Sequence, residues 1–338
     1  LPFVVVLAHV PWSLYAIDLA ARGPRPSRGW LLLLALGVSE ILFGFPQGVY
    51  YAWLMETVYV ALMFWRCHDA RIFAFFAGTK VLALMIGAVQ LLPTWDMMSL
   101  SQRAAPDLDL QLSVSLHPYN FLSLLNPFLF QWRFYAPIKG DEPWDMPYMG
   151  VAAVMLACYA LLQARRMENK RAWLFFAAGL VVFGALSALG KYGFLYHLYT
   201  ALPLVNKFRA PARHLCIAHT GLALMAALGF AHLEAQACRG VKMPWKFLGW
   251  LLLLPAASII LTLAVSLGRV WTEFPAHAAL RHYTMPIHIL MLGSGMFFMA
   301  ALCVTAAARG RAWALAGLVL LTFADIGVYS LRHKPAKT

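Results

Sequence analysis

Four ionisable residues lie inside long apolar stretches, where a charge is costly and usually serves a function. Glu40, Glu56 and Lys80 fall in three consecutive stretches, and Asp325 falls in the last one. A rise of 1.5 Å per helical residue places the three acids in one half of a bilayer, about 7 to 12 Å from its outer face. We predict that Glu56 and Lys80 form an ion pair, because a lysine stem can reach along a neighbouring helix. We also predict a hydrated cavity, open to the outside, that is lined by Glu40, Glu56 and Asp325.

A second group of charges precedes the apolar stretch that begins at His214. Arg209 and Arg213 are four residues apart, Lys207 is close by, and Pro211 suits the first turn of a helix. Cations are unfavourable at a helix N-terminus, where the helix dipole is positive, so a bound anion would offset the penalty. Two guanidinium groups at a helix start are typical of a phosphate site. The alternative is that the arginines contact lipid headgroups.

Ten apolar stretches must position these residues. They are Leu1–Ala20, Leu31–Phe45, Gly48–Trp65, Ile72–Pro93, Tyr148–Leu162, Ala172–Leu189, His214–Ala237, Phe247–Leu267, Pro286–Ala308 and Ala312–Leu331. A helix needs about 20 apolar residues to cross the hydrocarbon core. Hydrophobic residues make up 62% of the chain and charged residues only 12%, against about 25% charged in a soluble domain. We predict an all-α, polytopic integral membrane bundle of about ten transmembrane helices, with residues 1–338 forming a single transmembrane domain.

The net charge of +13 is concentrated in short turns, which argues against nucleic-acid binding. Fourteen of the 27 Lys and Arg residues occupy every second connector: Arg22, Arg25, Arg28, Arg66, Arg71, Arg165, Arg166, Lys170, Arg171, Arg239, Lys242, Lys246, Arg309 and Arg311. Cytoplasmic loops carry such an excess, so connectors 94–147, 190–213 and 268–285 are expected outside. The five cysteines form no CxxC pair, and we predict reduced thiols and no metal site.

The longest connector, residues 94–147, is too long for a passive link. We predict that His117–Phe128 forms an amphipathic helix in the membrane interface, with Pro118 in its first turn and Asn126-Pro127 at its end. The aromatic residues of this loop fit either an interfacial belt or a platform beside a sugar or lipid headgroup.

Several short motifs occur in a fixed order along the chain: Gly44-Phe-Pro-Gln47 with Tyr50-Tyr51, Gln90-Leu-Leu-Pro-Thr94 with Ser101-Gln-Arg103, Tyr148-Met-Gly150, and Phe208-Arg-Ala-Pro-Ala-Arg213. In this order they resemble the YfhO-type bacterial membrane proteins, which are relatives of the C-type glycosyltransferase superfamily. The resemblance spans nearly all of residues 1–330. Phe45 is a departure, because many relatives have His there.

The resemblance implies an enzyme of the bacterial cytoplasmic (inner) membrane. It would move a sugar from a polyprenyl-phosphate donor to an extracytoplasmic cell-envelope polymer or lipid acceptor. By motif, Arg103, Arg209 and Arg213 are expected near phosphate, and Gln47 and Tyr51 at the mouth of the cavity. The superfamily's catalytic acid lies in a first outer loop that we expect upstream of Leu1. The chain is therefore interpreted as an N-terminally truncated fragment with no assignable catalytic base.

Two other classes of function stay open. One is a transporter or flippase of lipid-linked saccharides, although no inverted repeat is evident. The other is a non-catalytic membrane scaffold. No dinucleotide-binding or P-loop motif occurs, and no cofactor or metal is predicted.

Overall fold

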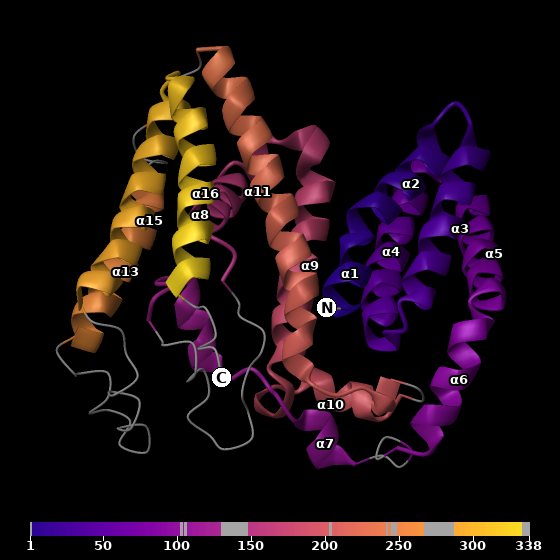
Figure 1. Cartoon of the computed structure of the whole chain (residues 1–338). Coiled ribbons are helices and arrows are strands. Elements are labelled where there is room, and N and C mark those ends of the chain that lie inside the picture. Colours follow the sequence, from indigo (N-terminus) through magenta and orange to yellow (C-terminus); the bar gives the residue numbers. More distant parts are fainter. Residues whose placement is uncertain are drawn as a thin grey trace. The chain divides into compact units, whose positions relative to one another are not determined.

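The computed structural model describes residues 2–101, 104, 107–129, 148–202, 205–240, 243–244, 249–266 and 287–332. These described residues form helices and connecting turns, with no β-strand among them (Figure 1). The chain divides into two compact units. Unit 1 comprises residues 1–111 and 200–208, and unit 2 comprises residues 112–199 and 209–338.

Unit 1 is built from a run of helices near the N-terminus. They are α1 (Pro2–Ala8), α2 (Val10–Arg22), α3 (Pro26–Leu42), α4 (Pro46–Cys67), α5 (Arg71–Ile86), α6 (Ala88–Ser99) and α7 (Leu108–Leu112), with the 3-10 turn η5 (Val205–Lys207). Proline in the first turn starts both α3 and α4, where its missing N–H costs no hydrogen bond. Helix α2 packs against α3 and α4, and α3 packs against α5.

The apolar stretch predicted over Ile72–Pro93 is not one straight helix. It is divided at Gly87 into α5 and α6, whose axes differ by 71°. No residue of α6 is buried, so this helix is held to the unit by few contacts.

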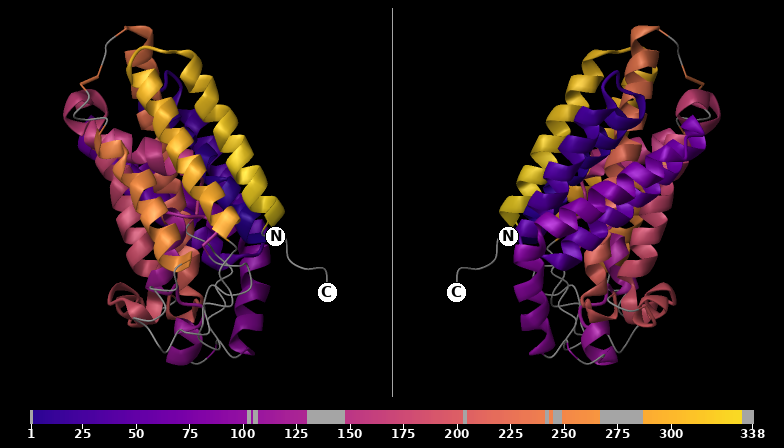
Figure 2. Two further views of the ribbon diagram at one scale, coloured as in Figure 1. Left: turned by 90° about the vertical axis from the view of Figure 1, so that its left-hand side faces the viewer. Right: turned by 90° about the vertical axis from the view of Figure 1, so that its right-hand side faces the viewer.

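Unit 2 contains the remaining helices. They are η1 (Pro118–Leu124), α8 (Val151–Leu162), η2 (Ala164–Arg166), η3 (Glu168–Lys170), α9 (Arg171–Ala188), η4 (Gly190–Tyr192), α10 (Leu195–Thr200), η6 (Pro211–His214), α11 (Leu215–Cys238), α13 (Leu253–Ser266), α15 (Ile287–Ala308) and α16 (Trp313–Arg332). Helix α11 packs against α8 and α9, and α15 packs against α8, α13 and α16. Figure 2 shows α15 and α16 running side by side at the C-terminal end of the unit.

Glycines bring α9 and α11 into close contact. A Cβ on Gly221 would lie 2.4 Å from the carbonyl oxygen of Ala177, and a Cβ on Gly184 would lie 2.5 Å from the amide nitrogen of Ala218. Small residues commonly allow such close approach between membrane helices.

Connectors that the charge pattern places on the same side of the membrane are bonded to each other within unit 2. The amide of Leu116 donates to Ala188 O at 2.9 Å, and the amide of Ala212 donates to Val114 O at 3.2 Å. Of the basic turns, the one after α11 meets the one between α15 and α16, where Met243 N donates to Ala308 O at 3.0 Å. This pairing agrees with the sidedness predicted from the Lys and Arg residues.

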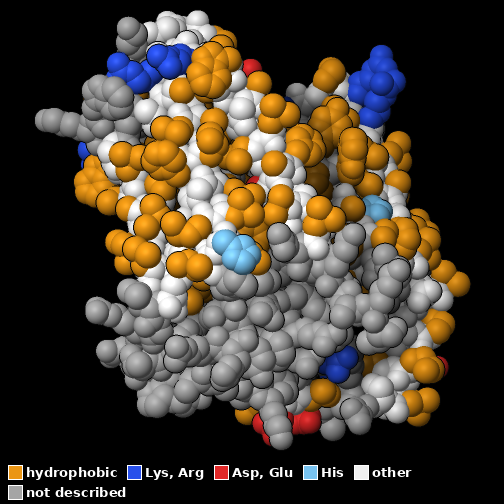
Figure 3. All heavy atoms as spheres, turned by 60° about the vertical axis from the view of Figure 1, so that its left-hand side comes forward, with side chains coloured by type: hydrophobic (Ala, Val, Ile, Leu, Met, Phe, Trp, Pro, Cys, Tyr) orange, Lys and Arg blue, Asp and Glu red, His pale blue; other side chains and the backbone are white. Residues whose placement is uncertain are grey.

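Among the described residues, six helices are long and apolar enough to cross a membrane. They are Phe3–Arg22, Arg171–Ala188, Pro211–Cys238, Gly249–Ser266, Ile287–Ala308 and Trp313–Leu331, and the bent α5–α6 pair would make a seventh. Figure 3 shows many hydrophobic side chains on the visible described face. Exposed apolar residues of the chain include Ile260, Leu320 and Phe323, which are 66%, 69% and 74% exposed. The protein is therefore a multi-pass helical membrane protein.

Three of the ten predicted spans do not meet this standard. Helices α3 and α8 have only 17 and 12 residues, and α8 would be about 18 Å long at 1.5 Å per residue. Helix α4 has 22 residues but is less apolar than the six.

The segment predicted as an interfacial helix is a 3-10 helix packed inside unit 2. Pro118 starts η1 as predicted, but Asn120 and Ser123 are buried. Asn126 is also buried, and its Nδ2 donates to Thr262 Oγ1 and to Leu290 O, each at 2.9 Å. Asn126 therefore bonds to α13 and α15, while the Ser123 hydroxyl donates to Asn120 O within η1.

Candidate functional site

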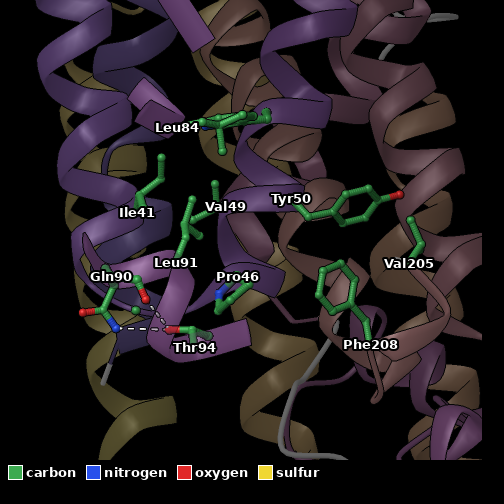
Figure 4. A pocket seen from close by; sticks show the side chains of 12 residues that line it. Ile41, Pro46, Val49, Tyr50, Leu84, Gln90, Leu91, Thr94, Val205 and Phe208 are labelled. Atoms are coloured by element: carbon green, nitrogen blue, oxygen red, sulfur yellow. Dashed lines mark hydrogen bonds between the residues drawn. The ribbon is translucent and has the colours of Figure 1, made fainter. Parts of the chain in front are cut away.

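A pocket of about 320 Å³ lies within unit 1 (Figure 4). Its walls come from the end of α3, the first two turns of α4, both halves of the bent α5–α6 pair, and the segment before Arg209. The lining residues are Ile41, Gly44, Pro46, Val49, Tyr50, Trp53, Leu84, Gln90, Leu91, Thr94, Val205 and Phe208.

Local sequence explains how the walls come together. Gly44 has φ +69°, a conformation that permits the tight turn between α3 and α4. Pro46 then starts α4, and residues of the first turns of this helix line the pocket. The bend at Gly87 turns α6 away from the axis of α5, so that Leu84 and Leu91 face one space from two directions.

The pocket is chemically apolar and aromatic, with a few polar groups. None of its lining residues carries a charge. The rings of Tyr50 and Phe208 lie 5.5 Å apart, while Gln90 Nε2 and Thr94 Oγ1 are 3.3 Å apart and hydrogen-bonded. Such a lining suits a hydrocarbon chain or ring that also carries a hydroxyl or similar group.

Behind this wall, buried charges connect α3, α4 and α5. Lys80 forms an ion pair with Glu56, which confirms the predicted pair. The Lys80 ammonium also lies 4.6 Å from the centre of the Trp53 ring. Trp53 Nε1 donates to Glu40 Oε2 at 2.9 Å. Trp53 therefore borders both the pocket and the charge cluster.

The residues predicted to line a cavity are not among those that line this pocket. Glu40 and Glu56 are fully buried and are absent from the lining of the pocket. Gln47 and Tyr51 are buried too, and Gln47 Nε2 donates to Tyr51 Oη at 2.7 Å. The pocket is lined instead by the preceding residue of each, Pro46 and Tyr50, which lie about 100° away around α4.

Asp325 belongs to unit 2 and has a structural environment of its own. It is fully buried, accepts a hydrogen bond from Tyr148 Oη at 2.5 Å, and accepts another from the Val151 amide at 2.7 Å. The structure therefore shows the Asp325 carboxylate as a cap at the start of α8. The cavity-lining role of Asp325 stays a prediction.

Two of the three arginines predicted near phosphate lie among the described residues, and their phosphate role stays a prediction. Pro211 does start a helical turn, η6, with Arg209 exposed just before it and Arg213 half-buried within it. However, the Ala212 amide donates to Val114 O and the Arg213 amide donates to Ala210 O. An anion here would depend on the guanidinium groups, because these backbone donors are already used. Arg103 lies outside the described residues.

An aromatic group near Arg213 was not predicted. Tyr196, Tyr199 and His214 pack with ring centres 5.4 to 5.7 Å apart. Burial raises the pKa of the Tyr196 phenol, so this group stays uncharged, while the Arg213 charge opposes that shift. The only sequence signal was the spacing of two tyrosines inside an apolar connector.

Comparisons with protein-family models, curated proteins and solved structures gave no match. Within the described part of the chain, no group of three or more His, Cys, Asp or Glu residues could hold a metal ion. Evidence for the function therefore comes from the geometry within each of the two units.

Proposed function

We propose that this chain is part of a YfhO-type, glycosyltransferase-like membrane protein that binds a polyprenyl-phosphate-linked sugar. The sugar would pass to a cell-envelope polymer or lipid on the outer side of the bacterial inner membrane. In this proposal, the pocket of unit 1 accepts an isoprenoid chain. Within unit 2, Arg209 and Arg213 are the residues that we propose bind a phosphate group.

One observation carries the proposal. Motifs that are far apart in the sequence contribute to one pocket: Gly44 and Pro46 from the first, Gln90 and Thr94 from the second, and Phe208 from the last. These are three of the four groups of motifs on which the resemblance depends; Tyr148-Met-Gly150 is not part of the pocket. An uncharged, aromatic lining is also what an isoprenoid chain requires, because its burial is driven by apolar area.

The test is photolabelling of the full-length protein in lipid nanodiscs with a prenyl phosphate that carries a photoreactive group on its chain. We expect labelled peptides from α4 and α6. Leu91→Trp fills the pocket and should reduce this labelling about tenfold, equivalent to about 1.4 kcal/mol. The matched control is Leu92→Trp on the same helix, where the side chain is 69% exposed. Equal labelling of the two variants would refute the pocket as a prenyl site.

The phosphate role is tested separately. Arg209→Ala with Arg213→Ala should weaken binding of the prenyl phosphate, because two charge-assisted contacts are lost. Binding of the corresponding prenyl alcohol should not change. If both probes bind the double variant as they bind the wild type, the arginines do not bind phosphate.

A transporter of lipid-linked saccharides is the second candidate, and the bent α5–α6 pair favours it. Transporters commonly use interrupted helices near their substrate sites, and here the interruption borders the pocket. Reconstituted full-length protein that moves a labelled prenyl-linked sugar across vesicles without transferring the sugar would favour this candidate.

A further inference from the structure

Buried ionisable groups from three helices meet beside the pocket of unit 1. Glu40 and Glu56 are 0% exposed and Lys80 is 6% exposed. The cluster therefore holds two carboxyl groups and a single ammonium group away from water.

Charge balance requires one more positive charge in this cluster. Lys80 neutralises Glu56, which leaves the Glu40 carboxyl without a cation. Two nearby carboxylates at a buried position cannot both remain ionised at low cost. The contacts of Glu40 with neighbouring helices among the described residues include no cation: Ser13 on α2 is a neutral hydroxyl, and the ring nitrogens of His9 face Val5 O at 2.8 Å and Ser39 Oγ at 3.0 Å.

The contacts of Glu40 suit a protonated acid. Oε2 accepts the Trp53 indole N–H at 2.9 Å, as a carbonyl oxygen would. Oε1 lies 3.4 Å from Ser13 Oγ, a hydroxyl that can donate or accept. Glu56 Oε1 is buried and has no hydrogen-bond partner among the described residues. An additional proton in the cluster would reduce the cost of that unsatisfied oxygen.

We propose that Glu40 is a proton-binding site within the membrane domain and that Trp53 links it to the pocket. The Trp53 side chain lines the pocket, and its Nε1 holds Glu40. A molecule that enters the pocket presses on the indole ring and changes the hydrogen bond to the protonated carboxyl. The proton site itself does not depend on the identity of that molecule.

Infrared spectroscopy of the full-length protein in nanodiscs tests both parts. A protonated carboxylic acid has a carbonyl stretching band that is separate from the amide and carboxylate bands. We expect the wild type to show such a band at neutral pH and Glu40→Gln to lack it, while thermal stability stays the same, because Gln has the shape of the protonated acid. Trp53→Phe should move the band to higher frequency, since the carbonyl loses a hydrogen-bond donor.

The link to the pocket is tested without a ligand. Leu91→Trp fills the pocket and should shift the Glu40 band, whereas the exposed Leu92→Trp should not. Leu91→Phe replaces the larger substitution if Leu91→Trp lowers thermal stability. A band that persists in Glu40→Gln would overturn the proton site. Loss of the band in that variant, with the same spectrum for the position-91 and position-92 variants, would overturn the link through Trp53.

Discussion

Lys80 and Glu56 form a buried ion pair, and each charge would be costly at this position without the other. Removing one partner from a buried pair strongly destabilises a protein, because the other charge stays buried. We expect Lys80→Gln to lower the free energy of unfolding by about 3 to 5 kcal/mol, measured as thermal or denaturant stability of the full-length protein in detergent.

The double variant Glu56→Gln with Lys80→Gln removes both charges and serves as the control. It should regain most of the loss, because neutral amides can bond to each other. If the double variant is as unstable as Lys80→Gln, the pair does not stabilise the fold through charge.

At the scale of elements, contact between α9 and α11 depends on the absence of side chains. Gly221→Ala would place a methyl group 2.4 Å from the Ala177 carbonyl oxygen, so the helices must move apart. Overpacking of this kind costs about 1 to 3 kcal/mol, which thermal unfolding in detergent measures. The matched variant on α9 is Gly179→Ala, where nothing lies within 4 Å of the added atom. It should leave stability unchanged or raise it, because Ala favours helix more than Gly.

Sequence patterns predicted the positions of most helices, but not which side of each helix is buried. Pro118 and Pro211 mark helix starts because proline favours a first turn, and the Glu56–Lys80 pair followed from the cost of buried charge. The pocket could not be predicted, because apolar residues occur all around α4 in a membrane and give no preferred face. Gln47 and Tyr51, predicted at the mouth of a cavity, directly follow Pro46 and Tyr50, which line the pocket.

Contacts between distant segments were also beyond sequence reasoning. Asn126 is an ordinary helix-ending residue by sequence, yet its amide group bonds α13 and α15. Asp325 was predicted to line a cavity, and the structure shows its carboxylate accepting a hydrogen bond from the Val151 amide at the start of α8. In both cases the polar side chain is satisfied by a partner more than 100 residues away, which no local pattern reveals.

At the scale of the whole molecule, the basic turns predict which ends of the helices face the cytoplasm. Cys67 and Cys238 lie at such turns and are exposed. A maleimide that cannot cross membranes should label both cysteines in inverted membrane vesicles. It should label neither cysteine in spheroplasts. A cysteine introduced at the exposed Asp107 should give the opposite result. Labelled peptides are identified by mass spectrometry, and labelling of Cys67 from outside would reverse the orientation.

The bond between Asp325 and the Val151 amide joins residues 174 positions apart. The ribosome synthesises α8 long before α16. The Val151 amide at the start of α8 therefore lacks its Asp325 acceptor until α16 is made. Chains that stop short of Asp325 should therefore be recognised as immature by membrane quality control, even though most of their helices have already been made.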